Sequence, residues 1–386
     1  MDFSFSEEQQ QLQDAIARFV QGDYSFERRH KILKSADGWS REVWQGLADL
    51  GVLAMNIPEA DGGLGYGPIE ALLAMQSAGP AMLCEPLLDS AVIATALVRD
   101  FGSPEQRAEL LPAMGSGERI VVLAHTEAAG RGQAVWVETS AKKSGDGYVL
   151  SGHKAVVSLA PAADELLVSA RVSGQPGDAE GVAVFRVAKD ASGLALKPFK
   201  TLDGRRAADV VLADVKVPAS SLLGAPTVSA NVAIDRALDL GLAAVCAEAL
   251  GVMEATVNAT IEYLKTRQQF GQPIGRFQAL QHRTADMLLH LEQSRSMAYL
   301  AAMHCNVADD TQRRKTLSAA KVVIGNACRF IGQQAVQLHG GMGMTEELNV
   351  SHFFKRLMAI ELSFGDTDTH LQRFAALTQR DIPLAA

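Results

Sequence analysis

Cysteine is scarce in this sequence, and the few cysteines present show no pattern of pairing. Four occur among 386 residues, each within a run of apolar or small residues and none in a CxxC pair: Cys84, Cys246, Cys305 and Cys328. This spacing excludes a disulfide framework and a thiolate zinc site, so we predict no metal centre. The N-terminus also lacks the basic and apolar regions of a signal peptide, which favours a cytoplasmic location.

Basic residues are outnumbered by acidic ones. The 36 Lys and Arg against 44 Asp and Glu give a formal net charge of −8, whereas nucleic-acid-binding proteins usually concentrate positive charge on one face. The longest charge-free segment, residues 217–234, is interrupted by Pro218 and by polar residues, so it does not predict a membrane span. We therefore expect neither nucleic acid nor a membrane as a partner.

Two phosphate-binding motifs are missing. No strand–turn–helix segment carries GxGxxG, and no GxxxxGK[ST] loop occurs. A Rossmann dinucleotide site and a P-loop are therefore not expected. The hydrophobic content of 48% and the chain length are instead those of a globular protein with two or three domains.

The hydrophobic periodicity changes twice along the chain. Leu12, Ile16 and Phe19 begin a helical pattern, whereas from about Ile120 short β-branched runs alternate with turn residues, and helical spacing returns after about Ser229. Strands without intervening helices indicate an antiparallel sheet. The fold class that follows is α+β. Its three predicted domains are a helical N-terminal domain, an antiparallel β middle domain and a C-terminal four-helix bundle, over residues 1–119, 120–227 and 228–386.

Local signals place individual elements within these domains. Helices are predicted to start at Ser6, where Gln9 completes a capping box, after Ser40, and at Ser103, where Pro104 takes the first helical position. Separate short strands are predicted near residues 120–123, 148–150, 155–157, 166–168, 182–185 and 210–212.

Four segments carry motifs that such a fold does not itself require. They are Thr266-Arg267-Gln268-Gln269-Phe270-Gly271-Gln272-Pro273-Ile274, Gln337-Leu338-His339-Gly340-Gly341-Met342-Gly343, His125-Thr126-Glu127 and Gly152-His153-Lys154. In these segments, and from end to end, the chain resembles the acyl-CoA dehydrogenase family. The resemblance implies an acyl-CoA dehydrogenase-like fold, FAD as cofactor and an acyl-CoA as substrate.

Arg267 and Phe270 suit a nucleotide on chemical grounds. A guanidinium presents a planar fork to a pyrophosphate, and an aromatic ring offers its face to a purine. The alternative is a solvated Arg beside a core Phe. The resemblance implies that this pair holds the ADP half of the FAD of a neighbouring subunit, and that Gln337 and Gly341 line its adenosine part. His339 is interpreted as structural.

The flavin ring is assigned to the predicted β domain. The resemblance implies that Leu123, His125, Thr126 and Ser158, at strand ends, bond the ring edge through backbone N–H groups and hydroxyls, which can stabilise a reduced flavin. Ordinary strand-end Thr and Ser side chains are the alternative. Val156 stands where the family often has a ring-shielding Trp.

The catalytic base is where the sequence departs from the family. Removal of an α-proton from a thioester needs a carboxylate. The resemblance places the usual Glu of the family at Phe364, and the Glu that a minority of the family uses at Gly241. Asp366 is the candidate base, with helix capping as the alternative. Asp239 is a candidate for contact with CoA, with a solvated helix face as the alternative.

The predicted function is FAD-dependent α,β-dehydrogenation of an acyl-CoA to the trans-2-enoyl-CoA, with electrons passed to an electron-transferring flavoprotein. The Phe-Gly-Asp ending resembles a bacterial subgroup whose members often form two-subunit dehydrogenases. A second hypothesis is therefore a flavin-binding partner subunit without its own base, in a dimer or tetramer with itself or a paralogous subunit. A flavin oxidase on the same fold is a third.

Overall fold

A computed structural model describes residues 5–130, 132–225 and 228–380. The chain divides into two compact units, and each is built from segments that are separated in sequence. Unit 1 combines the described residues up to Arg28 with Pro68–Leu83 and those from Leu242 onward, whereas unit 2 combines Arg29–Gly67 with Cys84–Gly241. The division into three sequence domains remains a prediction, and residue 227 at one boundary lies outside the described residues.

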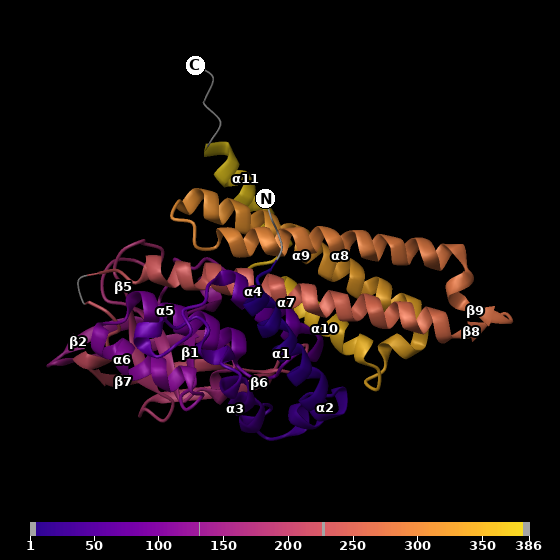
Figure 1. The fold of residues 1–386 in the computed structure, drawn as a ribbon. Coiled ribbons are helices and arrows are strands. Elements are labelled where there is room, and N and C mark those ends of the chain that lie inside the picture. Colours follow the sequence, from indigo (N-terminus) through magenta and orange to yellow (C-terminus); the bar gives the residue numbers. More distant parts are fainter. Residues whose placement is uncertain (1–4, 131, 226–227, 381–386) are drawn as a thin grey trace, which may run out of the picture. The chain divides into compact units, whose positions relative to one another are not determined.

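Unit 1 is helical. Its helices are α1 (Glu7–Asp23), α4 (Pro68–Ala78), the larger part of α7 (Asn231–Thr266), α8 (Gln278–His304), α9 (Asp310–His339), α10 (Asn349–Leu362) and α11 (Thr367–Arg380). Helix α9 lies against α8, α10 and α11 (Figure 1). The short strands β8 (Gln268–Gln269) and β9 (Gln272–Pro273) form a hairpin after α7. The capping box predicted at Ser6 is confirmed, because its side chain accepts from the Gln9 N–H and the Gln9 side chain from the Ser6 N–H.

Helix α7 is long and predominantly apolar. By length and composition it could cross a membrane, with a mean hydropathy of 1.6 over its most apolar window, but 89% of that window is buried inside the protein. Its apolar residues therefore serve the core. Helix α7 approaches the segment of α4 and Gly79 closely, because Gly251 of α7 and Gly79 both lack a Cβ. A Cβ on Gly79 would lie 2.7 Å from the Glu248 carbonyl oxygen of α7.

Unit 2 combines one sheet with short helices. The helices are α3 (Arg41–Asp49), the π-helix η4 (Leu87–Ala94), α5 (Thr95–Phe101) and α6 (Pro104–Gly115), while α2 (Phe26–Lys34) spans the division between the units. Ser40 and Ser103 cap α3 and α6 as predicted. The strands are β1 (Val121–Ala124), β2 (Ser140–Ser144), β3 (Gly147–Ser158), β4 (Glu165–Arg171), β5 (Val182–Ala188), β6 (Leu194–Lys200) and β7 (Arg206–Pro218).

The sheet differs from the predicted one in several respects. Its order is β1-β4-β2-β3-β7-β6, with β5 also paired to β4, and β1 runs parallel to β4 rather than antiparallel. The runs at residues 148–150 and 155–157 belong to one long strand, β3, whose register against β7 shifts twice. Each shift marks a bulge, and a bulge bends a strand without ending it.

Candidate active site

Two predicted site segments of unit 2 lie side by side. The Ala155 N–H of β3 donates to the Thr126 carbonyl, just beyond β1, at 2.8 Å. Thr126 is exposed, and Leu123 and Ser158 are half-buried. Between them Val156 is 57% exposed and has a positive φ of 52°. The ends of β1 and β3 therefore form one accessible surface that carries three of the predicted cofactor contacts.

His125 turns its side chain away from this surface. The ring is buried, with Nδ1 at 2.9 Å from the Ser169 hydroxyl and Nε2 at 2.7 Å from the Ala134 carbonyl. Burial and, to a smaller extent, the nearby Lys154 ammonium lower the pKa of His125 to about 4. The imidazole is thus a neutral core group, and only the backbone of His125 remains for the predicted cofactor contact.

A buried ion pair lies beneath the same segments, and sequence reasoning gave its members no role. Lys154 is fully buried and donates to the Glu127 carboxylate at 2.6 Å and to the Ser169 hydroxyl at 2.9 Å. Burial lowers the pKa of Lys154 to about 8. Burial alone would raise the pKa of Glu127, but Lys154 and the hydrogen bonds from Thr139 and the Glu138 N–H hold it below its usual value. The one available signal was a lysine inside an apolar strand pattern.

The other predicted segments meet in unit 1. The Tyr263 hydroxyl donates to the His339 carbonyl at 3.4 Å, and the two rings stack at 4.3 Å. This contact brings the end of α7, with Arg267 and Phe270, beside the end of α9, with Gln337 and Gly341. His339 is buried, with Nδ1 at 2.8 Å from the Ala335 carbonyl, as its structural interpretation requires.

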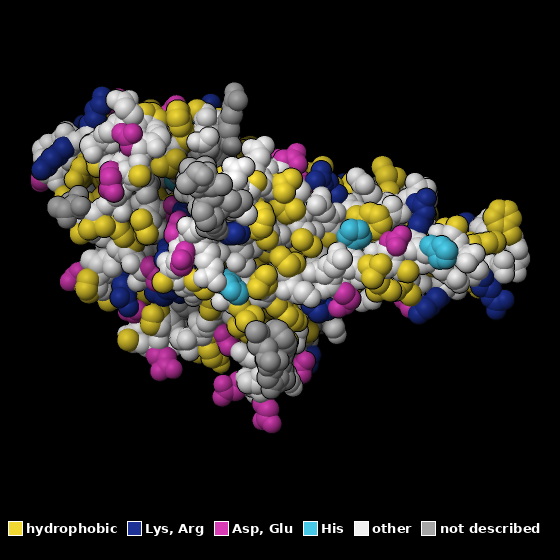
Figure 2. Space-filling view, turned by 90° about the horizontal axis from the view of Figure 1, so that it is seen from above, with side chains coloured by type: hydrophobic (Ala, Val, Ile, Leu, Met, Phe, Trp, Pro, Cys, Tyr) yellow, Lys and Arg dark blue, Asp and Glu magenta, His cyan; other side chains and the backbone are white. Residues whose placement is uncertain are grey.

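The side chains at this end of unit 1 face outward. Phe270 is 89% exposed and forms a T-shaped pair with Phe277, with ring centroids 6.0 Å apart, so the alternative of a core Phe is wrong. Arg267, Gln337 and Gly341 are exposed as well. Figure 2 shows hydrophobic side chains over the helices of unit 1 as far as the end that carries β8 and β9. A Cβ added to Gly341 would meet no atom within 4 Å, which leaves room for a ligand beside the backbone.

Asp366 is held as a helix cap. Its Oδ1 accepts from the Thr369 N–H at 2.8 Å, at the start of α11. Hydrogen bonds from Thr369 lower the pKa of Asp366, which weakens it as a base. This geometry favours the capping alternative over the predicted catalytic role.

The loop around Phe364 is held by hydrogen bonds to the side chains of His370 and Lys321. Phe364 has a positive φ of 60°, and its carbonyl oxygen lies 3.0 Å from His370 Nε2. The buried Lys321 ammonium donates to the Glu361 and Gly365 carbonyls, both at 2.7 Å. These hydrogen bonds hold the loop that includes Phe364, one of the two positions at which the family resemblance predicts a base.

Two carboxylates of α7, those of Asp239 and Glu248, are buried rather than solvated. Asp239 is 7% exposed, so the alternative of a solvated helix face is wrong for it. Glu248 is 5% exposed and pairs through both oxygens with Arg356 of α10, at 2.7 Å each. The Glu248 carboxylate therefore joins two helices of unit 1 and is engaged by a cation.

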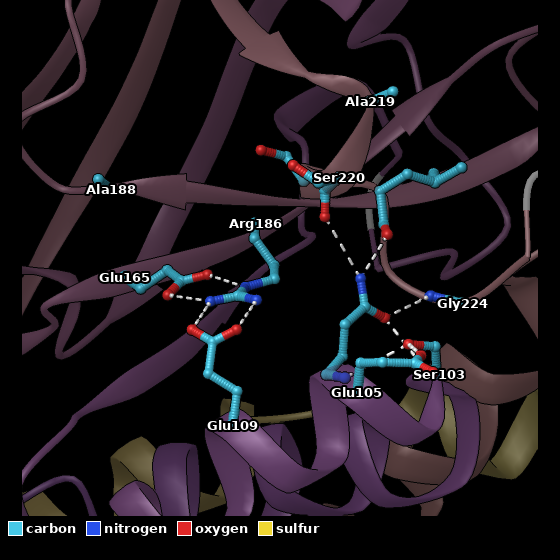
Figure 3. A pocket seen from close by; sticks show the side chains of 12 residues that line it. Ser103, Glu105, Glu109, Glu165, Arg186, Ala188, Ala219, Ser220 and Gly224 are labelled. Atoms are coloured by element: carbon cyan, nitrogen blue, oxygen red, sulfur yellow. Dashed lines mark hydrogen bonds and ion pairs between the residues drawn. The ribbon is translucent and has the colours of Figure 1, made fainter.

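A separate cleft of about 640 Å³ in unit 2 holds paired charges (Figure 3). Arg186 donates to Glu165 at 2.5 Å and to both oxygens of Glu109, at 2.8 and 2.9 Å. Hydrogen bonding to Arg186 lowers the pKa of Glu109 to about 2. Arg186 engages two of the three carboxylates that line this cleft, and none of the predicted site residues lines it.

Comparison with known proteins identifies the family. Models of the N-terminal, middle and C-terminal domains of acyl-CoA dehydrogenases match residues 6–118, 122–215 and 230–377. The mitochondrial isovaleryl-CoA dehydrogenase of Pongo abelii is 31% identical over 94% of this chain and 86% of its own length. The chain therefore belongs to the acyl-CoA dehydrogenase family and is an oxidoreductase.

Solved structures agree with this assignment. A chain of the ChsE4-ChsE5 complex from Mycobacterium tuberculosis is 28% identical, with a TM-score of 0.88 over 99% of this chain and 100% of that one. The butyryl-CoA dehydrogenase of Megasphaera elsdenii is 26% identical, with a TM-score of 0.88 over 98% and 100%. The overall fold is thus the acyl-CoA dehydrogenase fold.

Proposed function

We propose that the chain binds FAD and takes part in the α,β-dehydrogenation of an acyl-CoA thioester to the trans-2-enoyl-CoA. The observation that carries this proposal is the accessible surface at the ends of β1 and β3, where Thr126, Val156 and Ser158 lie together. Exposed hydroxyls and backbone groups at strand ends suit the polar edge of a flavin ring. The family membership supports the same reaction.

The residues of unit 1 fit the nucleotide part of FAD. A phenylalanine that is 89% exposed costs free energy in water unless a ligand or partner covers it. Arg267 lies three residues before it, with a guanidinium that suits a pyrophosphate. Arg267 and Phe270 would hold the ADP half of an FAD bound to a neighbouring subunit, and Gln337 and Gly341 would line its adenosine.

The reaction divides between the cofactor and the protein. When bound, FAD supplies the acceptor for the hydride that leaves the substrate β-carbon. The chain's own residues bind and orient the ring edge through Thr126, Ser158 and the backbone of residues 123–125. Preorganised donors of this kind need no rearrangement during the reaction. The α-proton would pass to a carboxylate, that of Asp366 or one from a paralogous subunit. The electrons would then pass to an electron-transferring flavoprotein.

A second candidate function is favoured by one observation. Asp366 caps α11, and Phe364 stands where much of the family has its base. We infer that this chain can serve as the flavin-binding partner in a heteromer in which a paralogous subunit supplies the carboxylate. The likeness to a chain of the ChsE4-ChsE5 complex supports this alternative.

The visible spectrum of the purified chain tests these proposals. A yellow protein whose flavin absorbance is bleached anaerobically by an acyl-CoA series supports a complete dehydrogenase. A yellow protein that bleaches only after a paralogous subunit is added supports the partner-subunit alternative. A colourless protein that takes up no FAD, alone or with the paralogue, would contradict both. Rapid reoxidation by oxygen with peroxide formation would indicate an oxidase.

A further inference from the structure

Val156 has an unusual backbone conformation at an exposed site. Its φ of 52° lies in the left-handed region, which β-branched residues avoid because Cβ approaches the backbone. The side chain is 57% exposed, so core packing does not account for this conformation. Such outliers persist only where surrounding contacts hold them, and they cluster at functional sites.

The register of the sheet shows what holds Val156. Lys154 pairs with Val210 and Val157 with Ala208, so both bulge residues of β3 stand opposite Asp209 of β7. A bulge leaves a backbone N–H without its ladder partner. The Val156 N–H instead donates to Asp209 Oδ1 at 3.0 Å.

The same bulge connects the predicted cofactor contacts. The N–H of Ala155, the other bulge residue, donates to the Thr126 carbonyl at 2.8 Å. Ser158 follows two residues after Val156 and ends β3. A change in the conformation of Val156 would therefore move Thr126 and Ser158 relative to each other.

We propose that Asp209 is a positioning residue for the flavin surface. Its carboxylate keeps Val156 in the left-handed conformation and so fixes the spacing between Thr126 and Ser158. Asp209 itself is partly exposed, at 32% for its side chain, and its Oδ2 lies 3.5 Å from His153 Nε2. The contact with FAD rests on the proposed function, whereas the hydrogen bond to Val156 does not.

A double-mutant cycle with Val156→Gly tests this role, because glycine adopts a positive φ without strain. FAD affinity is measured by fluorescence titration of the apoprotein, and stability by urea unfolding of the same apoprotein. We expect Asp209→Ala to weaken FAD binding by about tenfold in the wild-type background. In the Val156→Gly background the same substitution should weaken binding by less than about threefold, because the conformation no longer needs the carboxylate.

Asp214→Ala is a matched control on the same strand. Asp214 Oδ1 accepts from the Ser151 hydroxyl at 2.7 Å, and Asp214 itself has a positive φ of 53° near the other register shift of β3. This substitution should lower stability but leave FAD affinity unchanged, which separates loss of stability from loss of positioning.

Two results would overturn the proposal: unchanged FAD affinity in Asp209→Ala, or an equal loss in both backgrounds. A wild-type protein that binds no FAD would instead contradict the proposed function. In that case urea unfolding of the apoproteins still tests whether Asp209 holds Val156. Equal destabilisation by Asp209→Ala in the wild-type and Val156→Gly backgrounds would exclude this role.

Discussion

At the scale of single residues, His125 shows how burial converts a titratable group into a structural one. Its ring must stay neutral in the folded protein, because its pKa falls from 6.5 to about 4 through burial. In the unfolded chain the ring takes up a proton below about pH 6.5. Stability is therefore unaffected by this group above pH 6.5 and falls as the pH drops from 6.5 towards 4.

The pH dependence of unfolding should reflect this residue. Between pH 7 and pH 5 we expect the wild type to lose on the order of 1–2 kcal/mol more unfolding free energy than a His125→Asn variant, which carries no proton to bind. Urea unfolding at both pH values measures the difference. Parallel losses in the two proteins would show that His125 is protonated in the fold.

Asp366 offers a second test at this scale. Asn caps a helix about as well as Asp, whereas Ala costs about 1 kcal/mol at such a position. If Asp366 only caps α11, Asp366→Asn should retain both stability and bleaching by acyl-CoA, and Asp366→Ala should lose stability alone. Loss of bleaching in a stable Asp366→Asn protein with FAD bound would show instead that Asp366 is the base.

At the scale of elements, α4 and α7 can pack closely only because Gly79 and Gly251 have no Cβ at their contact. A Cβ on Gly251 would overlap the Gln76 carbonyl, and the neighbouring atoms are backbone that cannot rotate away. We expect Gly251→Ala to destabilise unit 1 by about 1–3 kcal/mol, or more if the helices separate. Thermal unfolding of the apoprotein measures the change.

Gly22→Ala serves as the comparison for that prediction. Gly22 lies in the last turn of α1, and an added Cβ would meet nothing within 4 Å. Alanine has the higher helix propensity, so this variant should be unchanged or more stable by up to about 1 kcal/mol. Equal effects of the two substitutions would contradict the role of close packing at Gly251.

The sequence predicts helices and strands whose hydrophobic pattern reflects burial in the core. It misses strands and strand pairings that depend on hydrogen bonds to distant segments. The helical spacing after about Ser229 predicts α7, because apolar residues such as Ile234, Leu242 and Val252 recur at helical intervals and are buried. Strands β2 and β6 are missed because most of their residues are half-buried or exposed, which removes the apolar alternation. The parallel pairing of β1 with β4 is also not visible locally, since it depends on how distant strands assemble.

In the candidate site, too, the sequence predicts some features and not others. Thr126, Ser158, Arg267 and Gln337 are predicted from motifs that resemble the family, and their roles stay predictions. The conformation of Val156 could not be read from its residue type, which disfavours a positive φ. The capping of α11 by Asp366 could be stated only as an alternative, because Asp serves both as a cap and as a base.

At the scale of the whole molecule, FAD should act as a stabilising ligand. A ligand that binds only the folded state, at a hundred times its Kd, adds about 2.7 kcal/mol to the unfolding free energy. We expect FAD to raise the Tm of the apoprotein and Arg267→Ala to reduce that rise. Differential scanning fluorimetry across FAD concentrations measures both effects.

Arg276→Ala is the control for Arg267→Ala. Both arginines are exposed and lie between α7 and α8, so their removal changes the net charge equally. Arg276→Ala should leave the FAD-dependent rise in Tm at the wild-type value. A similar reduction in both variants would indicate a general charge effect rather than a contact with the cofactor.

The division of the chain has a consequence for its synthesis on the ribosome. Helices α1 and α4 are translated before unit 2 is complete, but they belong to a unit whose remaining helices begin at Leu242. At 5–20 residues per second, the stretch between Leu83 and Leu242 takes on the order of ten seconds or more to translate. During that interval α8, one of the helices that pack against α4, has not been synthesised. The apolar residues of α4, including Leu72 and Leu73, are therefore not yet fully buried. The nascent chain therefore exposes an apolar segment early, and full burial of that segment depends on the last third of the polypeptide.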